Sequence, residues 1–129
     1  MAIRIVQLGS PRVPSEGIRL GTVRRPPRGV AKADYSRLNY YDLWLPELAP
    51  SAELLKWARS QPLTGRRWEI FARRYRAEVS QAPASHILGL LAALSADVNF
   101  SVGCFCEDVR TCHRSVLRDL LVQAGAALV

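Results

Sequence analysis

Two spacings of hydrophobic residues alternate along the chain, and together they predict a mixed α/β domain. Short runs of branched and aromatic residues predict strands over 3–8, 18–23 and 98–106, and an extended segment over 40–48. Apolar residues three and four positions apart predict helices over 51–60, 65–79 and 86–95, and a last helix from about 111 to 124. A strand–loop–helix unit closes the chain, so we expect a small, mostly parallel, Rossmann-like sheet flanked by helices. We place residues 1–129 in one domain.

Residues that begin and end helices support these boundaries. Ser51, Thr64, Ser85 and Thr111 are placed to cap the four helices, and Gly125 stands where a C-terminal cap belongs. The loop over 9–17 is shorter than a usual parallel crossover, so the relative direction of the first two strands stays open. The final "AALV" is either a short strand or a frayed end.

The segment "CFCEDVRTCHRS", residues 104–115, contains all three cysteines and one of the two histidines. It joins the end of a predicted strand to the start of a helix, the place where α/β sheets usually bind ligands. We predict an anion-binding site here for a small anionic or phosphate-bearing ligand. Its guanidinium groups would come from this segment and from the loop after the second strand: Arg24, Arg28, Arg110 and Arg114.

Three other interpretations of this segment remain open. Cys112 at a helix start, beside His113, has the setting of a reactive thiol, and we take these two residues as the candidate catalytic pair. We predict no metal site, because Cys104 and Cys106 would share one face of a strand rather than a tight turn. Alternatively the cysteines only fill the core. The sequence names no cofactor and leaves open whether the protein is an enzyme.

The net charge of +7 comes almost wholly from arginine, since Lys32 and Lys56 are the only lysines. A GC-rich coding bias and a phosphate-binding role both explain this excess. Five arginines crowd the helix over 65–79, opposite its aromatic stripe: Arg66, Arg67, Arg73, Arg74 and Arg76. We favour a solvated face, and keep nucleic-acid binding as the alternative function. A structural or partner-binding domain without a site is the third possibility.

Cellular placement follows from what the chain lacks. No apolar run approaches the roughly 20 residues that span a bilayer, and "MAIRIVQLGS" does not have the form of a signal peptide. An odd number of cysteines, all within nine positions, indicates free thiols in a reducing compartment. We therefore expect a cytoplasmic protein with no membrane partner, and the oligomeric state stays open.

Several segments together resemble the YeaO-like family, a bacterial domain of unknown function (domain of unknown function 488). They are "RRPPRG", "LWLPELAPS", "FARRYRAEV" and the strand that runs into "CHRS". The first loop matches the family pattern at Arg24, Pro27, Arg28 and Gly29, whereas Val23 replaces an aspartate, and Arg25 and Pro26 replace leucine and tryptophan. The wider superfamily pattern of a strand-end cysteine followed by cysteine–histidine–arginine is matched by Cys104, Cys112, His113 and Arg114. The resemblance implies a Rossmann-like fold, but no particular reaction.

Overall fold

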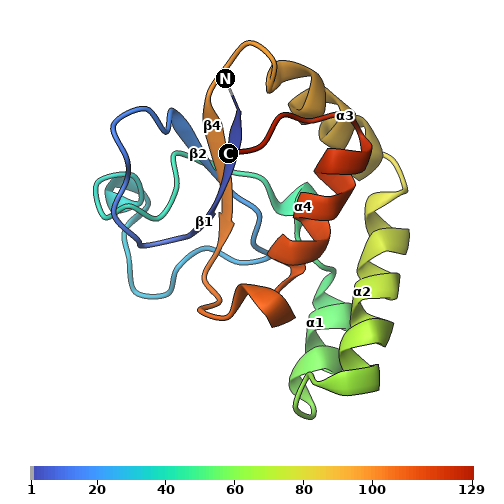
Figure 1. Ribbon diagram of the computed structural model, residues 1–129. Coiled ribbons are helices and arrows are strands. Elements are labelled where there is room, and N and C mark those ends of the chain that lie inside the picture. Colours follow the sequence, from blue (N-terminus) through green and yellow to red (C-terminus); the bar gives the residue numbers. More distant parts are fainter. Residues whose placement is uncertain (1) are drawn as a thin grey trace.

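A four-stranded parallel sheet forms the centre of the protein, described here over residues 2–129 by a computed structural model (Figure 1). The strands are β1 (Ile3–Gln7), β2 (Ile18–Gly21), β3 (Leu43–Trp44) and β4 (Phe100–Cys104), in the spatial order β1-β4-β2-β3. All neighbouring pairs are parallel. The predicted fold class, a small Rossmann-like parallel sheet flanked by helices, is confirmed.

The last strand in the chain lies between the first two. Val102 of β4 is in register with Ile5 of β1 on one side and with Leu20 of β2 on the other. The first two strands therefore run in the same direction, which the sequence left open. Ser101 and Gly103 are buried together with the apolar residues of β4, because both faces of this central strand are covered.

Four α-helices follow within the described residues: α1 (Ala52–Arg59), α2 (Gly65–Val79), α3 (Ala84–Leu94) and α4 (His113–Gln123). Three short 3-10 helices lie in the connections: η1 (Lys32–Asp34) between β2 and β3, η2 (Pro46–Leu48) before α1, and η3 (Val109–Thr111) before α4. Figure 1 shows α2, α3 and α4 on one side of the sheet, while segments 9–17 and 24–42 lie on the other. Over residues 2–129, no helix combines the length and the apolar character needed to cross a membrane.

Two buried clusters hold these layers together. The larger cluster packs Phe71 and Tyr75 of α2 and Leu117 of α4 against the sheet. The hydroxyl of Tyr75 is buried but donates to the carbonyl of Leu48 at 2.6 Å, so its burial leaves no unpaired polar group. The smaller cluster lies at the C-terminal ends of the strands and contains Leu8, Val23, Tyr41, Cys104 and Cys112.

Helix starts agree with the sequence only in part. Ser51 caps α1 as predicted, accepting from the backbone N–H of Leu54 at 3.1 Å, and Thr64 is the N-cap residue of α2 but accepts no hydrogen bond there. Helix α3 begins earlier than predicted, after Pro83 rather than Ser85. Thr111 does not cap α4 because it belongs to η3, and Cys112 is the N-cap residue instead.

The strand boundaries also differ. The extended segment over 40–48 keeps only the two residues of β3, because Pro46 starts η2. At the end of the chain, Leu128 makes a single parallel bridge to Ile3 of β1. The backbone N–H of Ile3 donates to the carbonyl of Ala127, and Val129 N–H donates to the carbonyl of Ile3.

Candidate functional site

The loops that leave β2 and β4 open on the same edge of the sheet, because these two strands are parallel neighbours. A cavity of about 970 Å³ lies at this edge. Four parts of the chain line it: Val23, Arg24 and Arg25 after β2; residues of segment 50–63 around α1; Phe71 of α2; and, from the end of β4 onward, Cys104, Phe105, Cys106, Thr111, Cys112 and His113. The loops after β2 and β4 therefore line the same cavity.

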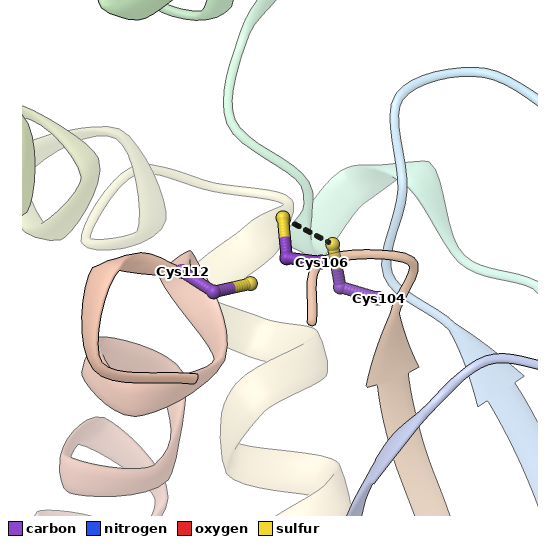
Figure 2. A group of neighbouring side chains, drawn as sticks. All are labelled: Cys104, Cys106 and Cys112. Carbon is purple, nitrogen blue, oxygen red and sulfur yellow. Dashed lines mark hydrogen bonds between the residues drawn. The ribbon is translucent and has the colours of Figure 1, made fainter. Parts of the chain in front are cut away.

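Three thiol groups meet at this rim (Figure 2). The Sγ atoms of Cys104, Cys106 and Cys112 all lie within 4.8 Å of one another, and those of Cys104 and Cys106 are 3.6 Å apart. All three are free thiols; Cys104 and Cys112 are buried, whereas Cys106 is exposed. The expectation that Cys104 and Cys106 share a strand face fails, because β4 ends at Cys104 and the chain turns before Cys106.

The imidazole of His113 is held in one orientation beside Cys112. Its Nε2 lies 2.7 Å from the carbonyl oxygen of Thr22, and since a carbonyl only accepts, Nε2 carries the proton. Nδ1 lies 3.8 Å from the Sγ of Cys112. The rings of Tyr75 and His113 pack edge to face, with centroids 5.4 Å apart, and both residues are buried. His113 is thus a buried proton acceptor next to a thiol.

The three thiols differ in acidity because of their mutual contacts. Hydrogen bonds from the thiols of Cys104 and Cys106 lower the pKa of Cys112, against the effect of burial, and His113 lowers it further. The hydrogen bond to Cys106, the hydrogen bond to Cys112 and then burial raise the pKa of Cys104. These directions of the pKa favour a thiolate on Cys112 over one on Cys104.

The buried guanidinium of Arg114 contacts the backbone of one of the three cysteines. Arg114 is 4% exposed, its Nη2 donates to the carbonyl oxygen of Cys106, and its Nε has no hydrogen-bond partner among residues 2–129. No carboxylate of the described residues lies within salt-bridge distance of it. A buried cation without a counter-charge is costly, so this position favours negative charge nearby.

The other predicted anion-binding arginines are not all brought together. Arg24 lines the cavity, but its guanidinium donates to the carbonyls of Pro46, Ala49 and Pro50 and so ties the loop after β2 to the start of α1. Arg28 is exposed and does not line the cavity. Arg110 is exposed, bound to Asp108 at 3.2 Å, and likewise outside the lining.

Three lining cations were missed from the sequence. Arg25, Lys56 and Arg59 are exposed residues of the cavity rim, and Glu53 is the one carboxylate that the described residues contribute to the lining. Lys56 and Arg59 are three positions apart and so share a face of α1. That spacing was visible in the sequence, but nothing in it showed that α1 lies beside the end of β4.

These features define a small Rossmann-like α/β domain with a thiol- and cation-lined cavity at the C-terminal ends of its strands. The family model described as "Active DUF488-N3 subclade" matches residues 3–125. The chain therefore belongs to the DUF488, or YeaO-like, family, which confirms the resemblance found in the sequence. No curated protein and no solved structure gives a match.

Proposed function

We propose that the protein binds a small anionic ligand in the 970 Å³ cavity and that Cys112 is the nucleophile that attacks it. One observation carries the proposal. The Sγ of Cys112 lies 3.8 Å from an imidazole nitrogen, at the N-cap of α4, on a cavity whose rim carries four cationic side chains and one carboxylate. The family description calls the subclade active, which fits a catalytic site.

The roles of the residues follow from their positions. Arg25, Lys56 and Arg59 attract the anion, and the first-turn N–H groups of α4 supply further donors. Nδ1 of His113 takes the thiol proton of Cys112 as Sγ bonds to the electrophilic atom of the ligand. The leaving group departs with its electron pair and takes the proton back from Nδ1. Arg24 and Arg114 act by holding the two loops in place.

The anion part of the proposal is tested by thermal unfolding in phosphate or sulfate. At ten times its Kd, a bound anion stabilises the fold by about 1.4 kcal/mol, a rise in Tm of about 5 °C. The triple variant Arg25→Ala, Lys56→Ala, Arg59→Ala should lose this rise. The matched control is Arg28→Ala with Arg110→Ala, which removes exposed arginines outside the cavity and should keep it. An equal rise in both variants would contradict the proposed site.

The thiol part is tested by comparing anionic iodoacetate with neutral iodoacetamide on chelator-treated protein. Cys112 should be labelled faster than Cys104 near neutral pH, and His113→Asn should slow it. The cationic rim should favour iodoacetate, so the triple variant should lower the iodoacetate-to-iodoacetamide rate ratio at Cys112 by about tenfold. The control double variant should leave that ratio unchanged. Equal, slow labelling of Cys104 and Cys112 would remove the nucleophile from the proposal.

Nucleic-acid binding by α2 has less support. The guanidiniums of Arg67 and Arg74 lie over the ring of Trp57, 4.2 and 5.3 Å from its centroid, and Arg76 lies 3.6 Å from Asp119. These arginines are partly occupied by groups of their own chain.

A cytoplasmic setting remains part of our proposal, because three free thiols suit a reducing compartment.

A further inference from the structure

We propose that Cys104, Cys106 and Cys112 together form a binding site for a thiophilic divalent metal ion, represented in the test by zinc. This goes beyond the proposed nucleophile, because a metal ion would hold the sulfur of Cys112. The metal-bound form and the free-thiol form are therefore two exclusive states of the same group.

The distances between the sulfur atoms suit such a site. Zinc–thiolate bonds of about 2.3 Å at tetrahedral angles place ligand sulfurs about 3.8 Å apart. Cys104 and Cys106 already stand 3.6 Å apart, and no pair in the trio exceeds 4.8 Å. The remaining pairs need to shorten by at most about 1 Å, which rotation of a cysteine side chain supplies.

The backbone holds the three cysteines without a metal. Cys104 is the last residue of β4, Cys112 is the N-cap residue of α4, and Arg114 fixes the turn between them through the carbonyl of Cys106. Figure 2 shows the three side chains pointing toward one another from these separate parts of the chain. A metal ion therefore has to order little of the chain when it binds.

The charge around the trio also favours the bound state. The guanidinium of Arg114 is buried, touches the backbone of Cys106 and has no carboxylate within salt-bridge distance among residues 2–129. Three thiolates, one divalent cation and this guanidinium together are neutral. The cluster thus supplies the counter-charge that Arg114 otherwise lacks.

The fourth ligand would come from the cavity. Three protein ligands and one exchangeable position are the arrangement of catalytic rather than structural zinc sites. All three cysteines line the cavity, so water or the anionic ligand reaches the same place. His113 does not join the trio, because neither of its ring nitrogens lies within 4.8 Å of all three sulfur atoms.

The test uses chelator-treated, tag-free protein titrated with zinc or cobalt under reducing conditions. We expect one equivalent to bind, and cobalt to give a thiolate charge-transfer band. Each single variant, Cys104→Ser, Cys106→Ser and Cys112→Ser, should bind at least about 100-fold more weakly. His86→Ala is the control, because His86 is an exposed histidine outside the site, and it should bind as the wild type does. Binding that ignores all three serine variants would overturn the proposal.

A second measurement needs no variant and so does not depend on folding. One equivalent of zinc should protect all three cysteines of the wild type from alkylation, and chelator should restore the labelling. Labelling unaffected by zinc would overturn the metal site. Fast labelling of Cys112 in the same metal-free sample would still support the nucleophile. Protection by zinc combined with slow labelling of metal-free Cys112 would support the metal site and contradict the nucleophile.

Discussion

Arg19 is the most enclosed charged residue of the protein's interior. It is fully buried in β2, and its guanidinium meets the carboxylate of Glu16 at 2.7 and 3.0 Å. Its Nη1 donates to the carbonyls of Ser10 and Asn39, and Glu16 also accepts from the hydroxyl of Ser101 at 2.6 Å. This network joins the loop after β1 to β2 and β4, so the side that faces away from the helices is held by polar contacts.

Breaking this pair should be costly. Glu16→Ala leaves a buried guanidinium without its partner, and we expect a loss of about 3–5 kcal/mol in the free energy of unfolding, measured by urea denaturation. Asp34→Ala is the matched control, because it breaks an ion pair of the same spacing whose side chains are 68% and 41% exposed. That control should change stability by less than about 1 kcal/mol. Equal losses in both variants would refute this account of Glu16.

A second carboxylate makes stability depend on pH. Burial by itself would raise the pKa of Asp42, but hydrogen bonds from Arg12, Ser36 and the backbone of Arg19 lower the pKa to about 2. A lowered folded-state pKa contributes stability above the unfolded-state value of about 4, and that contribution is lost as the pH falls from about 4 to 2. Between these values the unfolding free energy of the wild type should fall more steeply than that of Asp42→Asn. Parallel curves in urea titrations at pH 5, 4, 3 and 2.5 would contradict this.

Among the elements, β4 decides where the site lies. It pairs with β1 and β2 together and ends at the first cysteine of the trio. A Cβ added at Gly103 would lie 2.7 Å from Cδ2 of Leu8 and 2.8 Å from the carbonyl oxygen of Val6. The absence of a side chain at this position therefore lets the strands approach just before Cys104.

Gly103→Ala should consequently destabilise the fold by about 1–3 kcal/mol, because the obstacle includes backbone that cannot rotate away. Differential scanning calorimetry measures this. Gly89→Ala serves as the control, since an added Cβ at this helical position of α3 meets nothing within 4 Å, and it should be neutral or stabilising. A neutral Gly103→Ala would show that β1 and β4 have room to shift.

Helices and strands were predicted well from the sequence wherever apolar residues recurred at one constant spacing through a whole segment. The stripe of Phe71, Tyr75 and Val79 placed α2, and the apolar run before Cys104 placed β4. Strand order could not be predicted. Segment 8–17, which connects β1 to β2, contains no helix, and β4, from the far end of the chain, lies between these two strands.

The candidate site was predictable as a sheet edge with two loops, but not in its details. The sequence indicated Cys112 and His113, since a helix start is a local signal. The meeting of three sulfurs depends on a turn after Cys104 that has no periodic pattern. The cationic rim on α1 depends on packing between distant elements, and the tie of Arg110 to Asp108 depends on a side-chain rotamer.

At the scale of the whole molecule, the excess positive charge is spread rather than gathered. Some arginines are buried in the fold, as Arg19 and Arg114 are, and others cover aromatic rings or helix ends, as Arg67 does. The net charge of +7 still attracts polyanions at low salt. Such attraction is expected to be weak and independent of nucleotide sequence.

Fluorescence anisotropy with single-stranded and duplex DNA distinguishes attraction by the net charge from binding by a nucleic-acid interface on α2. We expect DNA binding that is seen in 20 mM salt to disappear near 200 mM salt. Changing Arg66 and Arg73 of α2 to alanine should weaken this binding no more than changing Arg28 and Arg37 to alanine. A selective loss on neutralising α2, with binding retained at 200 mM salt, would favour a nucleic-acid interface instead.

The segment after α4 pairs with the first residue of the edge strand β1. Ala127 and Val129 exchange backbone hydrogen bonds with Ile3, and Leu128 bridges to it. Deletion of residues 126–129 would leave the N–H and C=O of Ile3 unpaired at the edge of the sheet, where a second molecule can pair with them. The shortened protein should scatter more light than the full chain as its concentration rises, because residues 126–129 no longer cover this edge and limit aggregation.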